Sequence, residues 1–97
     1  MPYYPMKNFK FVRFEKSNTR FKKYDAIIQN KVLKTLHRIP FGDNRYFHFF
    51  DKTPLNIYSH LNHYDKDRKR RFLARHKRYL EIGYYSPVWF SINYLWK

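Results

Sequence analysis

The chain has 97 residues and no cysteine, and it carries a net charge of +14. This length provides for one small domain, and the lack of cysteine excludes disulfides, thiolate zinc sites and cysteine nucleophiles. No apolar run approaches the roughly 20 residues that span a bilayer, and the N-terminus MPYYPMKNFKF lacks the apolar segment of a signal peptide. We therefore expect one folded domain that acts inside a cell, with a core built from its 23% aromatic residues.

The basic residues form two blocks. Residues 1–42 have a net charge of +8 and residues 65–81 one of +5, while residues 43–64 are neutral and rich in aromatic side chains. Such a chain attracts polyanions, so its expected partners are nucleic acid, an acidic protein surface or an anionic membrane.

The N-terminal half reads as an arm followed by strands. Residues 1–8, which contain two prolines and two tyrosines, are predicted to form an extended arm. The alternating runs 9–16, 23–29 and 32–41 follow, separated by short turn-like segments. This pattern predicts a three-stranded antiparallel β-meander at about 9–41, with Tyr24, Ala26 and Ile28 on its inner face and Lys and Arg on its outer face.

Residues 43–64 show no clear period and are predicted to form an ordered loop. The loop carries the aromatic residues Tyr46, Phe47, Phe49 and Phe50, close to Arg45, His48 and Lys52. A small chain needs most of its aromatic side chains for its core or for a protein interface. Stacking of bases on these rings is the open alternative.

From Asp65 the period becomes helical. Phe72, Leu73, His76, Tyr79 and Leu80 fall on one stripe, and this predicts a helix at about 65–81. Asp65 is placed to cap its start, and Gly83 follows its end. A second, short helix is predicted at about 87–96, with Ser86 as its cap and Pro87 at its first position. The predicted fold is a single α+β domain over 9–97, in which the sheet packs on the main basic amphipathic helix.

The basic side chains of the 65–81 helix are the candidate binding residues. They lie outside the apolar stripe, where they either contact the phosphates of a nucleic acid or form the solvated face of the helix. No Asn or Gln lies within this helix, so reading of base sequence is not expected. The candidate nucleic-acid-binding residues are Arg68, Arg70, Arg71, Arg75 and Arg78 of the helix, with Lys10, Arg13, Lys22 and Lys23 of the sheet.

Histidines near the start of the helix raise the question of a metal. His60, His63, Asp65 and His76 have the chemistry of ligands, but His76 belongs to the apolar stripe, where a hydrogen-bonded structural histidine is the commoner case. We therefore expect no metal, cofactor or catalytic residue. A membrane partner is not expected either, because the apolar stripe is needed to pack on the sheet.

Residues 24–96 resemble a family of small basic proteins of unknown activity from large nucleocytoplasmic DNA viruses. The motifs that carry the resemblance are Phe41-Gly42, His60 with His63 and Asp65, the basic run 66–71 closing on Arg75-His76, and the ending Ser91-Ile92-Asn93-Tyr94-Leu95-Trp96. The resemblance implies a viral origin, a place inside an infected host cell, and association with the virion.

The function expected from these observations is non-enzymatic: a small basic viral protein that binds nucleic acid non-specifically through phosphates. Two alternatives remain open. The first is a structural protein of a virion or minor capsid that contacts acidic protein surfaces. The second is a nuclease dependent on a divalent metal, which would lose its activity on replacement of His63 or His76.

Overall fold

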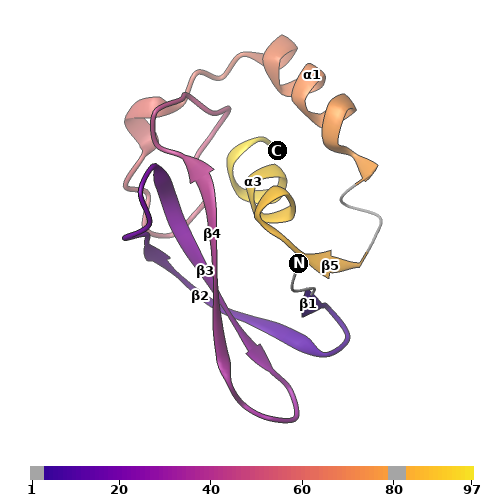
Figure 1. Ribbon diagram of the computed structural model, residues 1–97. Helices are drawn as coiled ribbons and strands as arrows, with labels where there is room; N and C mark the ends of the chain where they lie inside the picture. The colour runs from indigo at the N-terminus through magenta and orange to yellow at the C-terminus, as the bar shows by residue number, and fades with distance from the viewer. Residues whose placement is uncertain (1–3, 79–82) are drawn as a thin grey trace.

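The computed structural model describes residues 4–78 and 83–97, and Figure 1 shows their arrangement. Within these residues it confirms an α+β fold with a three-stranded antiparallel sheet and two α-helices. The elements in chain order are β1 (Tyr4–Pro5), β2 (Phe9–Lys16), β3 (Lys22–Asn30), β4 (Leu36–Asp43), the 3-10 turn η1 (Ser59–Leu61), α1 (Lys66–His76), β5 (Tyr84–Tyr85) and α3 (Pro87–Leu95).

The central strand of the sheet is β3, which pairs with β2 on one side and β4 on the other. Its inner face is the one that the alternation predicts, because Tyr24, Ala26 and Ile28 are all fully buried. Tyr24 lies opposite Phe41 of β4, and Ala26 lies opposite Phe14 of β2. Phe14 and Phe41 join the same core cluster, so side chains from all three strands form the core.

The short helix α3 covers this core (Figure 1). Ser86 caps it by accepting a hydrogen bond from the backbone N–H of Trp89, and Phe90, Ile92 and Leu95 are buried. Because three of its nine residues are buried and none is charged, α3 can press against the sheet along its length.

The basic helix α1 differs from the expected helix in its packing and in its length. We expected a helix at about 65–81 packed on the sheet, but none of the residues of α1 is buried, and its main contact is with α3. The helix ends at His76, and residues 79–81 of the predicted span lie outside the described residues, as do the stripe residues Tyr79 and Leu80. Since its remaining stripe is narrow, α1 packs by few apolar contacts.

The last part of the expected N-terminal arm forms secondary structure and packs on the rest of the chain. Tyr4 and Pro5 form β1, which pairs with Tyr85 and Tyr84 of β5 in an antiparallel ribbon. The ring of Tyr4 meets the ring of Phe9 edge to face at 5.2 Å between centroids. Residues 4–5 are therefore held by pairing and packing within the chain itself.

Residues 44–64, which follow β4, form an ordered loop, as the aromatic content predicts. Two backbone hydrogen bonds tie the loop to the end of α3, from the N–H of Phe50 to the carbonyl of Leu95 and from the N–H of Lys52 to that of Tyr94. Gly42 begins the turn into the loop with a φ of +74°, and a Cβ there would lie 2.9 Å from Leu95 Cδ1. Glycine is thus required where β4 passes α3.

No helix among the described residues is both long enough and apolar enough to cross a membrane.

Candidate nucleic-acid interface

An open groove of about 860 Å³ lies between α1 and the start of the loop after β4. We call it the arginine–aromatic groove, because its walls carry arginine and aromatic side chains alone. The lining residues are Arg45, Tyr46, Phe47, Arg68, Arg71, Phe72, Arg75 and Trp96. The groove therefore combines four guanidinium groups with four aromatic rings.

The basic wall of the groove is one face of α1. Arg68, Arg71 and Arg75 are three and four residues apart, so their side chains project from the same side of the helix. The Asp65 carboxylate fixes the start of α1 by accepting hydrogen bonds from the backbone N–H groups of Asp67 and Arg68, at 2.9 and 3.2 Å. Backbone hydrogen bonding holds the pKa of Asp65 below its usual value, which keeps this cap charged.

An aromatic stack sets the distance between α1 and the rest of the molecule. The ring of Phe72 lies 4.2 Å from that of Trp96 with an angle of 6° between the planes. A second contact places Lys69 Nζ 4.6 Å from the centre of the Phe49 ring. These contacts hold the arginine face of α1 toward the loop rather than toward solvent alone.

The opposite wall begins with Arg45. Its guanidinium donates two hydrogen bonds to the Asp43 carboxylate, at 3.0 and 2.7 Å, and lies 4.1 Å from the centre of the Phe21 ring. Hydrogen bonds from Arg45 lower the pKa of Asp43 to about 2, so the pair stays ionised at neutral pH. The next two side chains, Tyr46 and Phe47, are 64% and 55% exposed. They are the most accessible rings of this wall.

Lys23 is not available to a ligand, contrary to our sequence prediction. Its side chain is only 2% exposed, and its Nζ donates to the Tyr46 carbonyl at 3.0 Å and to His48 Nδ1 at 2.7 Å. Burial lowers the pKa of Lys23 to about 8. His48 in turn donates from Nε2 to the Asn62 side-chain oxygen at 2.7 Å. Lys23 thus supports the backbone of the aromatic wall from below.

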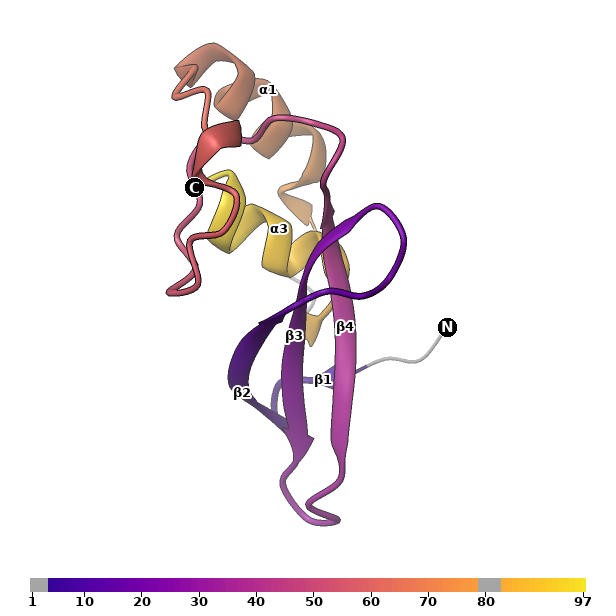
Figure 2. The ribbon, with the colours of Figure 1, turned by 90° about the vertical axis from the view of Figure 1, so that its left-hand side faces the viewer.

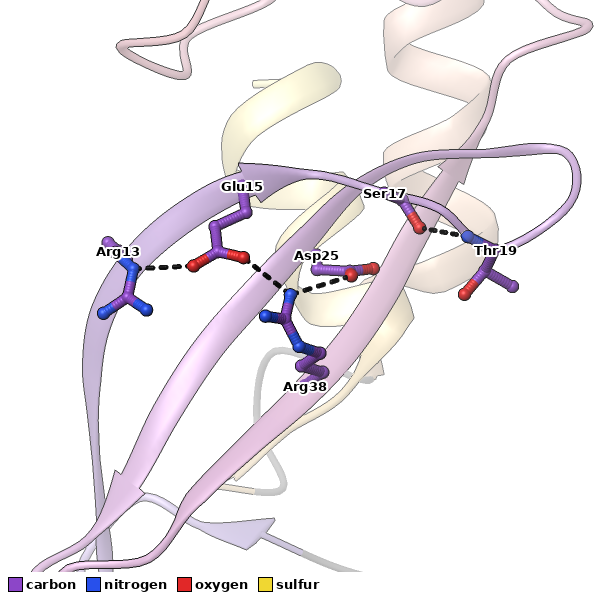
Figure 3. Close-up of polar contacts among 6 residues, drawn as sticks. All are labelled: Arg13, Glu15, Ser17, Thr19, Asp25 and Arg38. Atoms are coloured by element: carbon purple, nitrogen blue, oxygen red, sulfur yellow. Dashed lines mark hydrogen bonds and ion pairs between the residues drawn. The ribbon is translucent and has the colours of Figure 1, made fainter.

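The other predicted sheet residues lie away from the groove. Arg13 is paired with Glu15 at 2.8 Å, in a chain of polar contacts that continues through Arg38 to Asp25 across the outer face of the sheet (Figure 3). Lys10 is exposed on the same strand as Arg13 and does not line the groove. Lys22 lines a neighbouring hollow that also contains Phe72.

The predicted helix residues divide between the two sides of α1. Arg68, Arg71 and Arg75 line the groove, whereas Arg70 is paired with Asp67 at 3.3 Å on the other side. Arg78 follows the end of α1 and is not among the groove residues. Sequence reasoning missed Arg45 as a candidate residue of this groove, although its position next to Tyr46 and Phe47 is the signal that could have found it.

The histidines considered as metal ligands do not gather. His63 Nδ1 accepts a hydrogen bond from the backbone N–H of Asp65 at 2.8 Å, and the ring of His76 packs 4.6 Å from that of Phe72. Within residues 4–78 and 83–97, no group of three or more His, Asp or Glu side chains is placed to hold a metal ion.

Comparisons with protein families, with curated proteins and with solved structures find no match to this chain.

Proposed function

We propose that the chain is a nucleic-acid-binding protein that contacts phosphates without reading base sequence, and that the arginine face of α1 is the main contact. The observation that carries the proposal is the state of Arg71 and Arg75. Both are exposed and line the groove, and neither has a carboxylate within ion-pair distance in the described part of the chain. Among residues 4–78 and 83–97, the one carboxylate near Arg68 is that of Asp65, at 3.7 Å.

Arginine suits this role because its planar guanidinium donates two parallel hydrogen bonds to the oxygens of one phosphate. Side chains spaced along a single helix face can follow successive phosphates of a strand. The net charge of +14 adds a long-range attraction that depends on no particular contact. Each neutralised phosphate releases counterions, so the affinity must fall steeply as salt rises.

The motifs that resemble a family from large nucleocytoplasmic DNA viruses suggest where such binding would take place. We propose that the protein acts inside an infected cell or within a virion, where a compact basic protein can neutralise the phosphates of a packaged or replicating genome.

The first test is binding of the purified protein to DNA and RNA over a salt series, with Arg71→Glu/Arg75→Glu alongside. The wild-type chain should show a slope of about −3 in log K against log salt, as expected for three or four neutralised phosphates. The double variant should bind at least about tenfold more weakly at physiological salt, with a slope closer to zero by about 2.

The matched control is Arg70→Glu/Lys77→Glu, which makes the same change in net charge on the opposite side of the helix. Its affinity should stay within about threefold of the wild type, because only the long-range attraction is reduced. Equal losses in the two variants would mean that total charge, not the groove, determines binding. Weak wild-type binding at physiological salt would remove the proposal.

A second candidate function rests on the other end of the molecule. The turn between β3 and β4 projects away from α1 in both ribbon views (Figure 2). At this tip Val32 and Leu33 are 85% and 70% exposed, next to the exposed Lys31 and Lys34. Apolar side chains framed by lysines fit an acidic protein surface with an apolar centre. This favours a structural role in a virion or capsid as the alternative.

The tip can be tested without disturbing the fold. A photoreactive amino acid at Leu33 should cross-link one defined acidic protein in cells that produce the chain, and the same group at Val12, which is 39% exposed on β2, should not. Val32→Ser/Leu33→Ser should abolish a tagged chain's co-purification with that protein while leaving the free energy of unfolding within about 0.5 kcal/mol of wild type. Identical cross-links from both positions would count against the tip as a contact surface.

A further inference from the structure

A second, deeper hollow adjoins the arginine–aromatic groove. It has a volume of about 200 Å³. Four aromatic residues, Tyr46, Phe47, Phe72 and Trp96, line both spaces. Because a cavity of about 150 Å³ is enough to hold a benzene ring, this hollow can admit a planar aromatic group that enters from the groove.

The exposed rings at this entrance are not used by the core. Tyr46 and Phe47 are absent from the buried cluster and from the partly buried residues that pack against it. Phe72 and Trp96, by contrast, stack on each other and connect α1 to α3. Tyr46 and Phe47 are therefore two large side chains that stay mostly exposed, opposite a wall of arginines, with the Arg45 guanidinium 5.6 Å from the centre of the Tyr46 ring.

The two walls match the two faces of a single nucleic-acid strand. A single strand presents phosphates on one side and unpaired bases on the other, and bases stack on aromatic side chains whatever their sequence. In a duplex the bases are paired and stacked inside the helix, where rings in a groove cannot reach their faces. The groove is thus expected to bind a single strand better than a duplex, because only a single strand exposes the faces of its bases.

We infer that the groove is a binding site for single-stranded nucleic acid: the backbone lies along Arg68, Arg71 and Arg75, and the bases stack on Tyr46 and Phe47, with one base entering the hollow. This inference rests on the proposed phosphate contacts and adds the form of nucleic acid that the site selects. The stacking surfaces accept any base, so the proposed preference is for strand type, although Asp43 and Ser91 also line the hollow.

The test compares three probes of equal length: a dodecamer of thymidylate, an abasic dodecamer with the same phosphates, and a duplex. The wild-type chain should bind the thymidylate strand about tenfold more tightly than the abasic strand, since each stacked base contributes to affinity. Tyr46→Ala/Phe47→Ala should remove this difference, while the abasic strand and the duplex bind as they do to the wild type.

Tyr64→Ala is the matched control, because Tyr64 is 59% exposed and does not line the groove or the hollow. It should leave the thymidylate affinity within about twofold of wild type. Equal wild-type affinity for the thymidylate and abasic strands would overturn the stacking inference. If that binding still fell steeply with salt, the proposal of phosphate contacts would stand. Tighter binding of the duplex than of the thymidylate strand would also overturn it. Failure of all three probes to bind would overturn both.

Discussion

Replacement of Asp51 with alanine is expected to lower the free energy of unfolding by about 4 kcal/mol, because several donors in or next to the core lose an acceptor together. The Asp51 side chain is 2% exposed. It accepts from the Tyr24 hydroxyl at 2.5 Å, from the backbone N–H and hydroxyl of Thr53 at 2.9 and 2.7 Å, and from the N–H of Tyr58 at 3.2 Å. Asp51 thus links the loop 44–64 to Tyr24 of the central strand β3.

Denaturation by urea measures this loss directly. Asp51→Asn should lower the free energy of unfolding by about half as much. The amide keeps one acceptor oxygen, but its NH₂ group replaces the other oxygen and so points its N–H groups at hydrogen-bond donors. Asp67→Ala, at a carboxylate that is 76% exposed, should change the free energy of unfolding by less than about 0.5 kcal/mol. A loss of under 1 kcal/mol in Asp51→Ala would show that the loop is held by other contacts.

Acidification from pH 7 to pH 4.5 is expected to cost about 2 kcal/mol of stability, mainly through His48. His48 is fully buried, and burial followed by the nearby charge of Lys23 lowers its pKa to about 4. Its unfolded pKa is 6.5. Between pH 6.5 and pH 4 the unfolded chain therefore binds a proton that the folded chain does not, so stability falls as the pH falls.

The pH dependence can be assigned to His48 by substitution. His48→Gln should flatten the curve of unfolding free energy against pH above 4.5, whereas His60→Gln, at an exposed residue, should leave its slope unchanged. His63 and His76 also have a lowered pKa from burial, so a small slope should remain in His48→Gln. Asp43, with a pKa of about 2, contributes only at lower pH. An unaltered slope in His48→Gln would exclude His48 as the cause.

The sequence predicted the features that depend on near neighbours. The alternation of Tyr24, Ala26 and Ile28 identified the inner face of β3, and Asp65 and Ser86 identified the starts of the two helices. The helical period placed Arg71 and Arg75 outside the apolar stripe, and the structure shows that they line one wall of the groove. These features follow from the repeat of a strand or a helix and from local capping, and a few consecutive residues specify each of them.

Only the tertiary structure decided which charged residues are accessible and which helix covers the sheet. Lys23 looks in sequence like Lys22, yet its Nζ is buried because residues 46 and 48 fold back over the start of β3 and supply acceptors. Arg45 and α1 face each other across the groove because Phe72 stacks on Trp96, which is 24 positions along the chain. Local pattern sets the direction of a side chain within its element, but burial and partnership depend on segments that are distant in sequence, and these meet only in the folded chain.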